Sequence, residues 1–200
     1  MYAFGMTDFT NTPTANPAPT KPHLVCLVAQ SRDGFIAKDS THRSETWVSD
    51  EDKTHFHAKL NECDWIIAGR NTAEQYANTM RPYNCLVFTQ HPENKVAEHF
   101  AHIDPEVDDP IAYLAAHGAK RVAVLGGTRV YDYCLENNLL DEVWLTIEPT
   151  DFYSGLPAFN KAHLLEEHLS LKAHEDLNDK GTELLYYKKD YVWVGLIASQ

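Results

Sequence analysis

The chain has no apolar run near the roughly 20 residues that cross a bilayer as a helix, so a membrane-spanning protein is not expected. It is also poor in basic residues, with 17 Lys and Arg against 29 Asp and Glu and a formal net charge of −12. Such an excess of negative charge is unfavourable for binding nucleic acid or an anionic membrane surface. We therefore expect neither as a partner, and a bound phosphate would need local cations and backbone amides.

Cysteine is scarce as well. The four cysteines are Cys26, Cys63, Cys85 and Cys134, and no two of them form a CxxC pair. Three lie in or beside apolar runs, where a cysteine usually acts as a small hydrophobic residue. We interpret all four as reduced thiols and expect a cytoplasmic protein. No HExxH pattern occurs among the eleven histidines, and we expect no metal site.

Two common nucleotide motifs are missing. The sequence has neither GxGxxG nor GxxxxGK[ST], which excludes the standard dinucleotide fingerprint and the P-loop. Residues 1–22 are rich in Thr, Asn, Pro and Ala and lack the features of a secretory signal, so we expect a disordered tail. One domain is predicted over residues 23–189. The extension 190–200 fits either an extra strand or an oligomer contact.

Short apolar runs alternate with helix signals along most of the chain. The runs His23–Ala29, Trp65–Ala68 and Arg121–Leu125 predict strands buried on both faces. Further strands are predicted at 85–88, 141–147 and weakly within 95–103, and helices from Ser49, around 73–77, at 110–117 and at 128–137. The segments 163–176 and 182–189 predict two strands joined by a turn. The order predicts an α/β fold with a mostly parallel central sheet, helices on both faces and an antiparallel C-terminal hairpin.

Two predicted strand–helix junctions combine glycine with a cation. Gly126 and Gly127 precede a helix with Arg129 in its first turn, and Gly69 and Arg70 follow another buried strand. Free N–H groups at a helix start attract phosphate, and glycine allows a ligand close to the backbone. A glycine pair can also be a plain structural turn. Two such junctions at the carboxyl ends of one sheet nevertheless predict a ligand with several phosphates.

Together these motifs resemble the dihydrofolate reductase superfamily, which includes the reductase domain of bacterial riboflavin biosynthesis. The resemblance covers about residues 23–189. The stretch 124–131 is similar to the nicotinamide-cofactor turn of that family, 69–72 to its second phosphate-binding turn, and 31–37 to the loop that closes over the nicotinamide. Residues 141–146 and 155–159 resemble the late strand and loop of the riboflavin branch. The resemblance implies a dihydrofolate reductase-like fold.

The resemblance also implies a site for NADPH. Read onto this chain, its residues are Ala29, Ile36, Gly69, Arg70, Thr72, Thr89, Gly126, Gly127, Thr128, Arg129 and Tyr131. The adjacent glycines and Thr128 would hold the pyrophosphate, although many relatives have a third glycine in place of Thr128. The two arginines would lie near the phosphates, including the 2′-phosphate that distinguishes NADPH from NADH, and Thr89 would flank the adenosine. Ala29, Ile36 and Tyr131 would touch the nicotinamide.

On the substrate side, the spacing of Trp47, Asp52 and Phe56 resembles that of the folate reductases. In that family an acid at this spacing grips the amino-pyrimidine edge of the pterin, so Asp52 is the candidate catalytic residue. Phe56 would stack on the ring, with Trp47 and Thr146 as further substrate residues. A carboxylate can accept two hydrogen bonds from such an edge, and burial would raise its pKa. However, acids in a first helical turn are favoured in any case.

The leading interpretation is an NADPH-dependent reductase of a pyrimidine- or pterin-like ring, of the 5-amino-6-(5-phosphoribosylamino)uracil reductase type. Hydride transfer needs no protein nucleophile, which fits the absence of a catalytic triad. Reduction of dihydrofolate is the alternative within this class. A nucleotide-binding protein without catalysis is the alternative from another class. The family resemblance also implies a homodimer.

Overall fold

The computed structural model describes residues 20–190. The predicted extension beyond Asp190 and the predicted tail before residue 20 lie outside the described residues. Within the described part, no helix has the length and apolar character needed to cross a membrane.

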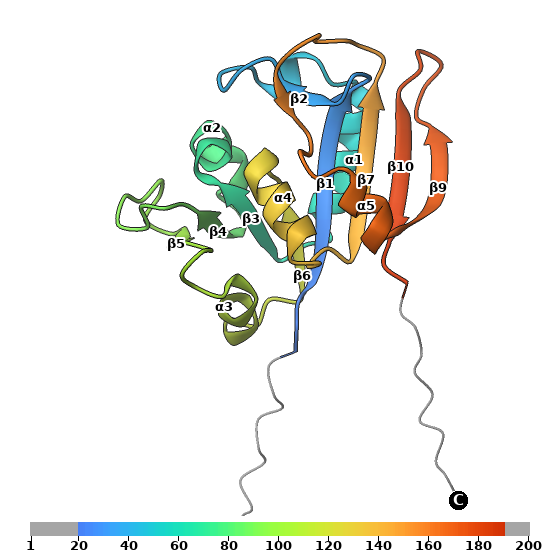
Figure 1. Ribbon diagram of the computed structural model, residues 1–200. Helices are drawn as coiled ribbons and strands as arrows, with labels where there is room; N and C mark the ends of the chain where they lie inside the picture. The colour runs from blue at the N-terminus through green and yellow to red at the C-terminus, as the bar shows by residue number, and fades with distance from the viewer. Residues whose placement is uncertain (1–19, 191–200) are drawn as a thin grey trace, which may run out of the picture.

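Strands and helices alternate along the first three quarters of the chain, as Figure 1 shows. The strands are β1 (His23–Ser31), β2 (Phe35–Ala37), β3 (Trp65–Gly69), β4 (Asn84–Phe88), β5 (Ala101–Ile103), β6 (Arg121–Val124), β7 (Glu142–Glu148), β8 (Leu156–Pro157), β9 (Ser170–Asp176) and β10 (Glu183–Lys188). The helices are α1 (Asp50–Leu60), α2 (Arg70–Met80), α3 (Pro110–Ala116), α4 (Thr128–Glu136) and α5 (His163–His168), with a short 3-10 turn at Ser44–Thr46.

One sheet of eight strands forms the centre of the molecule, in the order β5-β4-β3-β6-β1-β7-β10-β9. The first six strands in this order are parallel, while β10 runs antiparallel to both β7 and β9. The predicted sheet class and the C-terminal hairpin are therefore confirmed. A separate ribbon of β2 and β8 lies above the carboxyl ends of the strands (Figure 1).

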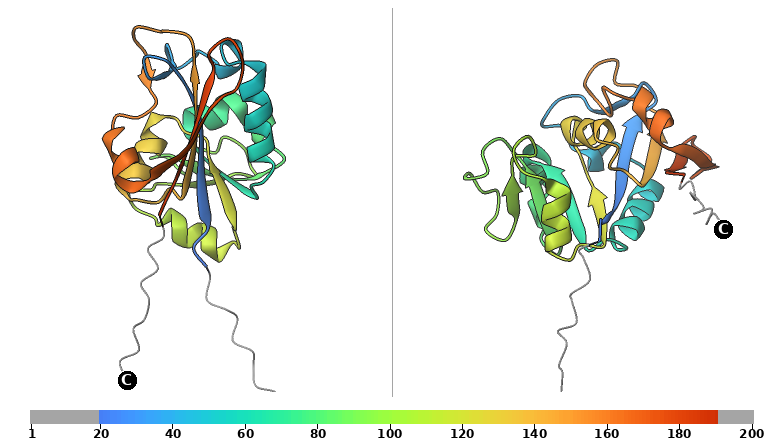
Figure 2. Two further views of the ribbon diagram at one scale, coloured as in Figure 1. Left: turned by 90° about the vertical axis from the view of Figure 1, so that its right-hand side faces the viewer. Right: turned by 60° about the horizontal axis from the view of Figure 1, so that its bottom comes forward.

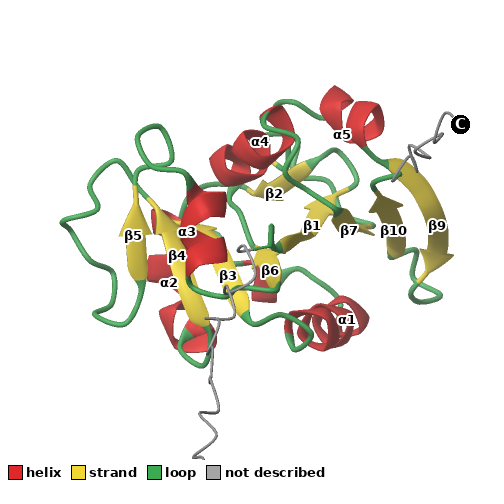
Figure 3. Ribbon diagram, turned by 90° about the horizontal axis from the view of Figure 1, so that it is seen from below, coloured by secondary structure: helices red, strands yellow, loops and turns green. Residues whose placement is uncertain are grey.

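Helices cover both faces of the sheet, as Figures 2 and 3 show. On one face α1 and α2 bury Leu60 and Met80 against β1, β3 and β4. On the other face α3, α4 and α5 bury Leu114, Leu135 and Leu165 in a second cluster. Because the central strands are covered on both sides, their side chains are apolar in both directions, which explains their continuous apolar runs.

Helix α1 starts where the capping pattern predicts. The Ser49 side chain accepts a hydrogen bond from the Asp52 N–H, and Asp50, Glu51 and Asp52 occupy the first turn. An acceptor at the N-cap satisfies an N–H group that has no partner within the helix, and the acids interact favourably with the helix dipole. This cap fixes the first turn of α1, from which Asp52 projects.

The segment 163–176 differs from its prediction as a single strand. Its first part is the helix α5, and only Ser170–Asp176 forms β9. Leu165 and Leu169 are four residues apart and both buried, so they face the core together beside α4. That spacing suits a helix, but a helix of six residues is too short to show a periodicity in the sequence. Helix α2 is also longer than predicted, because it begins directly at Arg70.

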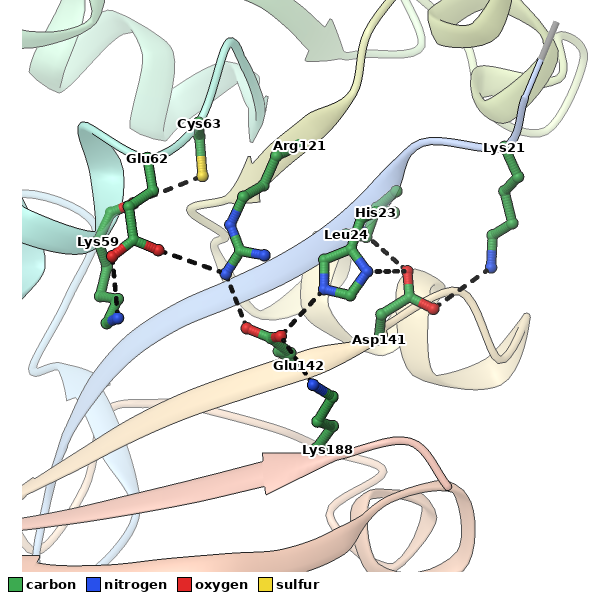
Figure 4. A network of polar contacts seen from close by, with 10 residues as sticks. All are labelled: Lys21, His23, Leu24, Lys59, Glu62, Cys63, Arg121, Asp141, Glu142 and Lys188. Carbon is green, nitrogen blue, oxygen red and sulfur yellow. Dashed lines mark hydrogen bonds and ion pairs between the residues drawn. The ribbon is translucent and has the colours of Figure 1, made fainter. Parts of the chain in front are cut away.

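A network of charged side chains lies at the amino end of the central strands, shown in Figure 4. The buried Glu142 carboxylate is 2.7 Å from the Arg121 guanidinium, 3.1 Å from the His23 ring and 3.7 Å from the Lys188 ammonium. Burial alone would raise the pKa of Glu142, but the hydrogen bond and charge of Arg121, with those of His23, hold it below its usual value. The network ties β1, β6, β7 and β10 together at the end of the sheet opposite to the carboxyl ends of its parallel strands.

Candidate active site

A cavity of about 930 Å³ opens at the carboxyl ends of the parallel strands. Its walls come from the ends of β1, β3 and β4, from the loop after β6, from β7, and from helices α1, α2 and α4. This is where ligands bind in open α/β sheets, because the strand ends leave a crevice between neighbouring connections. Most of the predicted site residues line this one cavity.

The two glycine junctions meet there. The Gly69 N–H donates to the Gly126 carbonyl at 2.7 Å, so the starts of α2 and α4 lie side by side. Gly126 has a φ of +83°, and a Cβ at this position would lie 2.5 Å from the Tyr131 ring. A Cβ at Gly127 would make only ordinary contacts, at 3.6 Å to Ile36 and 4.0 Å to Thr72. Gly126 is therefore needed for the backbone path, whereas Gly127 keeps the cavity open.

Two cations lie on this side of the cavity. The Arg70 guanidinium donates to the Asn94 carbonyl at 2.6 Å and forms an ion pair with Glu74 at 2.9 Å, both of which fix its position. Arg129 is exposed in the first turn of α4 and also lines the cavity. Since the protein is strongly acidic, these two side chains are the local positive charge that a phosphate would need.

The other predicted cofactor residues were also expected at this cavity. The lining contains, together with Gly127, six of them: Ala29, Ile36, Gly69, Thr72, Thr89 and Thr128. The Thr128 hydroxyl, however, donates to the Pro157 carbonyl, so it anchors the loop at β8 rather than standing free. Tyr131 lines the cavity with a buried ring, and its hydroxyl donates to the Leu27 carbonyl at 3.1 Å. Gly126, by contrast, is buried and does not line the cavity.

Asp52 is the buried acid of the cavity, with 7% of its surface exposed. Burial raises its pKa to about 6, and the nearby negative charge of Glu148 acts in the same direction, while a hydrogen bond with the Thr146 side chain partly opposes them. An acid with this pKa holds a proton at mildly acidic pH and can exchange it near neutrality. Phe56, one turn along α1, lines the same wall.

Glu148 is a residue that no sequence pattern singled out. Its buried carboxylate accepts bonds from the Ser49 N–H and hydroxyl, both at 2.7 Å, and from the Thr182 hydroxyl at 2.8 Å. It thereby holds the N-cap of α1 against β7 and places a charge near Asp52. A glutamate at the end of a strand is common, and only the packing of α1 on β7 gives it this role.

Trp47 lies apart from the cavity lining. Its ring packs edge-on against Phe152 at 5.0 Å, beneath the loop that follows β7. The cavity wall beside Asp52 instead contains Lys53, His55 and Trp144, which the sequence did not single out. The structure therefore brings together Asp52, Phe56 and Thr146 from the predicted substrate set and leaves Trp47 outside.

The loop between β1 and β2 is tied to the loop after β7 by Asp33. Its carboxylate accepts from the Ser31 hydroxyl at 2.6 Å and from the backbone N–H groups of Phe152 and Tyr153 at 2.6–3.1 Å. These bonds hold the segment 31–37, and with it Ile36, at the mouth of the cavity. Within residues 20–190, no group of three His, Cys, Asp or Glu side chains is arranged to hold a metal ion.

Proteins of known structure share this architecture. The reductase and deaminase of Thermotoga maritima, a diaminohydroxyphosphoribosylaminopyrimidine deaminase/5-amino-6-(5-phosphoribosylamino)uracil reductase, superposes with a TM-score of 0.68 at 16% identity. The match covers 85% of this chain and 57% of that protein. Dihydrofolate reductase of Enterococcus faecalis, in complex with NADP(H) and RAB-propyl, gives a TM-score of 0.63 at 18% identity, covering 84% of this chain and 97% of that one.

Sequence comparison agrees with the fold. The uncharacterized protein YwjB of Bacillus subtilis (strain 168) is 27% identical over 145 residues, which are 68% of this chain and 82% of YwjB. The model of the family named dihydrofolate reductase matches residues 23–188, nearly all of the described chain. This chain therefore belongs to the dihydrofolate reductase family.

Proposed function

We propose that this protein is an NADPH-dependent reductase of a pyrimidine- or pterin-like ring. The observation that carries the proposal is one cavity with two different ends. At one end, glycines precede the N-termini of two helices, and two arginines lie nearby. At the other end is a buried acid whose pKa is about 6. That combination suits a dinucleotide at the first end and a nitrogen heterocycle at the second.

The described residues fit the cofactor. The open face of Gly127 leaves the N-terminus of α4 accessible to a pyrophosphate, and Arg129 and Arg70 lie beside it. Two cations at this end favour the additional 2′-phosphate of NADPH over NADH. Bound NADPH supplies the hydride in such a reaction. Ala29, Ile36 and Tyr131 would form the apolar wall that aligns its ring and excludes water.

Asp52 would bind the substrate ring and move the proton. As a carboxylate it accepts hydrogen bonds from a ring N–H and an exocyclic amine, and as a carboxylic acid it donates a proton to a ring nitrogen. Thr146 holds the carboxyl in place, and Phe56 offers an aromatic face one turn along α1. Because the protonated form is the donor, turnover should fall as pH rises through about 6.

The preferred substrate is a 5-amino-6-(5-phosphoribosylamino)uracil-type pyrimidine. The named activity of the Thermotoga maritima protein, which shares this fold, supports the choice. Dihydrofolate is the second candidate, since the Enterococcus faecalis enzyme has the same fold with NADP(H) bound. Loss of NADPH absorbance with each substrate separates the two. Quenching or enhancement of NADPH fluorescence without turnover on either would instead indicate a nucleotide-binding protein without catalysis.

Substitution of Asp52 tests the assigned role. Asp52→Asn should lower kcat by about 100-fold or more, which is the usual effect of removing a general acid, and leave the Kd for NADPH within about twofold. Asp50→Asn is the matched control, because Asp50 is an exposed acid in the same helical turn. Equal losses of NADPH affinity and turnover in Asp52→Asn would remove the role assigned to it.

A further inference from the structure

The turn between β9 and β10 lies at the same end of the sheet as the cavity (Figure 1). Strand β10 runs antiparallel to β7, and its first residue, Glu183, pairs with Ile147. Thr182 therefore comes beside Glu148, the residue that holds the N-cap of α1. Thr182 is buried, with 1% of its surface exposed. A residue of the C-terminal hairpin thus reaches the support of the helix that carries Asp52.

The two oxygens of the Glu148 carboxylate are held by different elements. Oε1 accepts from the Ser49 N–H and hydroxyl, both at 2.7 Å, and Oε2 accepts from the Thr182 hydroxyl at 2.8 Å. The Ser49 hydroxyl in turn accepts from the Asp52 N–H at 3.2 Å. A continuous path of hydrogen bonds therefore runs from the hairpin to the backbone of Asp52.

Asn178 orders the turn that carries Thr182. Its side-chain carbonyl accepts from the backbone N–H groups of Lys180 and Thr182 at 3.0 and 3.2 Å, and its amide donates to the Thr182 hydroxyl at 3.0 Å. Because this hydroxyl accepts from Asn178, its own proton is directed to Glu148. The amide also donates to the Glu51 carboxylate at 3.1 Å, which gives the turn a second contact with α1.

Loss of the Thr182 hydroxyl would affect Asp52 through its surroundings. The Glu148 carboxylate is buried, and a buried charge that loses a hydrogen bond is unfavourable, so its side chain would turn or take up water. Either change loosens the first turn of α1 and lets water reach Asp52. Burial is the main cause of the raised pKa of Asp52; Glu148 on β7 adds to it, while a hydrogen bond with Thr146 and the charge of Lys53 on α1 oppose it. Water at Asp52 would therefore lower this pKa.

We infer that Thr182 is a positioning residue for Asp52, which makes the β9–β10 turn part of the candidate site although no residue of the turn lines the cavity. Thr182 acts through Glu148 and Ser49, which hold the first turn of α1 in place. Asn178 assists by ordering the turn. The consequence for turnover rests on the proposed function, whereas the effect on the ionisation of Asp52 is independent of any substrate.

Two substitutions of one side chain test the inference. Thr182→Val keeps the shape of the side chain and removes its hydroxyl, whereas Thr182→Ser keeps the hydroxyl and removes a methyl group. Thr54→Val is the control for the same chemical change at an exposed position of α1. The first measurement is the NMR chemical shift of the Asp52 carboxyl carbon against pH, in the full chain without ligand, assigned with Asp52→Asn. The second is kcat together with the Kd for NADPH.

Thr182→Val should lower the midpoint of the Asp52 titration by about half a pH unit or more from the wild-type value of about 6. It should also reduce kcat by about tenfold and leave the Kd for NADPH within about twofold, because the acid is displaced and the cofactor end is not. Thr182→Ser and Thr54→Val should remain close to wild type in all three quantities.

An unchanged Asp52 titration in folded Thr182→Val would overturn the inference. If that variant does not fold, Asn178→Ala, at a half-buried position of the turn, should shift the midpoint in the same direction by a smaller amount, and no shift there would overturn it equally. A shifted titration with no turnover of either proposed substrate by wild-type protein would support the positioning role and contradict the proposed function.

Discussion

At the scale of single residues, the site depends on two buried carboxylates with different tasks. Asp52 faces the cavity, and burial raises its pKa to about 6. Glu148 faces the protein, where three hydrogen bonds satisfy its carboxylate. The second acid holds the helix that carries the first, and its charge also makes ionisation of Asp52 less favourable.

Removing the charge of Glu148 should therefore lower the pKa of Asp52. In Glu148→Gln the pH at which kcat declines should move from about 6 to a lower value, because one of the two effects that raise the Asp52 pKa is gone. The pH dependence of kcat measures this shift. Glu51→Gln, which neutralises an exposed acid in the same helical turn, should leave the profile in place. A profile that does not move in folded Glu148→Gln would show that the two carboxylates do not interact.

At the scale of elements, the junction between β6 and α4 separates two kinds of glycine. Gly126 lies in the left-handed region with the Tyr131 ring against it, whereas Gly127 has an ordinary φ of −74° and faces the cavity. A side chain at Gly126 would disturb the fold, whereas a side chain at Gly127 would occupy space in the cavity that a ligand could use. The two positions are adjacent in sequence and opposite in role.

Alanine substitution distinguishes them. Gly126→Ala should lower the free energy of unfolding by about 2 kcal/mol or more, from the unfavourable φ and the overlap with Tyr131. Gly127→Ala should change stability by less than about 1 kcal/mol and weaken NADPH binding by about tenfold, since its methyl group would lie where we propose that the pyrophosphate binds. Urea unfolding and NADPH fluorescence titration measure the two effects. Loss of stability in Gly127→Ala with normal NADPH affinity would mean that the turn is purely structural.

At the scale of the whole molecule, the candidate site and a network of buried charge lie at opposite ends of the sheet. The cavity occupies the carboxyl ends of the strands, and the network around Glu142 occupies the amino ends (Figure 4). The four cysteines are free and buried in the structure. Burial raises the pKa of Cys85 to about 12, so its thiol is unreactive in the folded protein. The homodimer stays a prediction, which light scattering on the purified chain would measure.

Arg121→Met should destabilise the protein without affecting its site. It leaves the buried Glu142 carboxylate without its nearest cation, and we expect a loss of about 2 to 4 kcal/mol at pH 7. The loss should shrink as pH falls and Glu142 becomes protonated, since the pKa of a paired carboxyl is depressed and its contribution disappears on acidification. Lys188→Met, on a half-exposed partner at 3.7 Å, should cost less than about 1 kcal/mol. A large fall in kcat/KM would show that the two ends are coupled.

The sequence alone determined the alternation of strands and helices, the parallel sheet with its antiparallel hairpin, and the glycine turns with their arginines, but not the helix α5. These are local properties, because burial on both faces, capping and glycine turns are set by residues close together in the chain. The sequence also identified Asp52 as a candidate site residue, since its spacing from Trp47 and Phe56 is a local pattern.

Tertiary structure alone decided the contacts between elements around the cavity. Glu148 meets Ser49 across 99 positions of sequence, and the His55 and Trp144 rings meet only because α1 packs on β7. The packing also placed Trp47 outside the cavity lining, although its sequence spacing suited a substrate residue. Contacts between elements depend on how faces pack, and a periodicity of two or 3.6 residues specifies which face is buried without specifying which partner it meets.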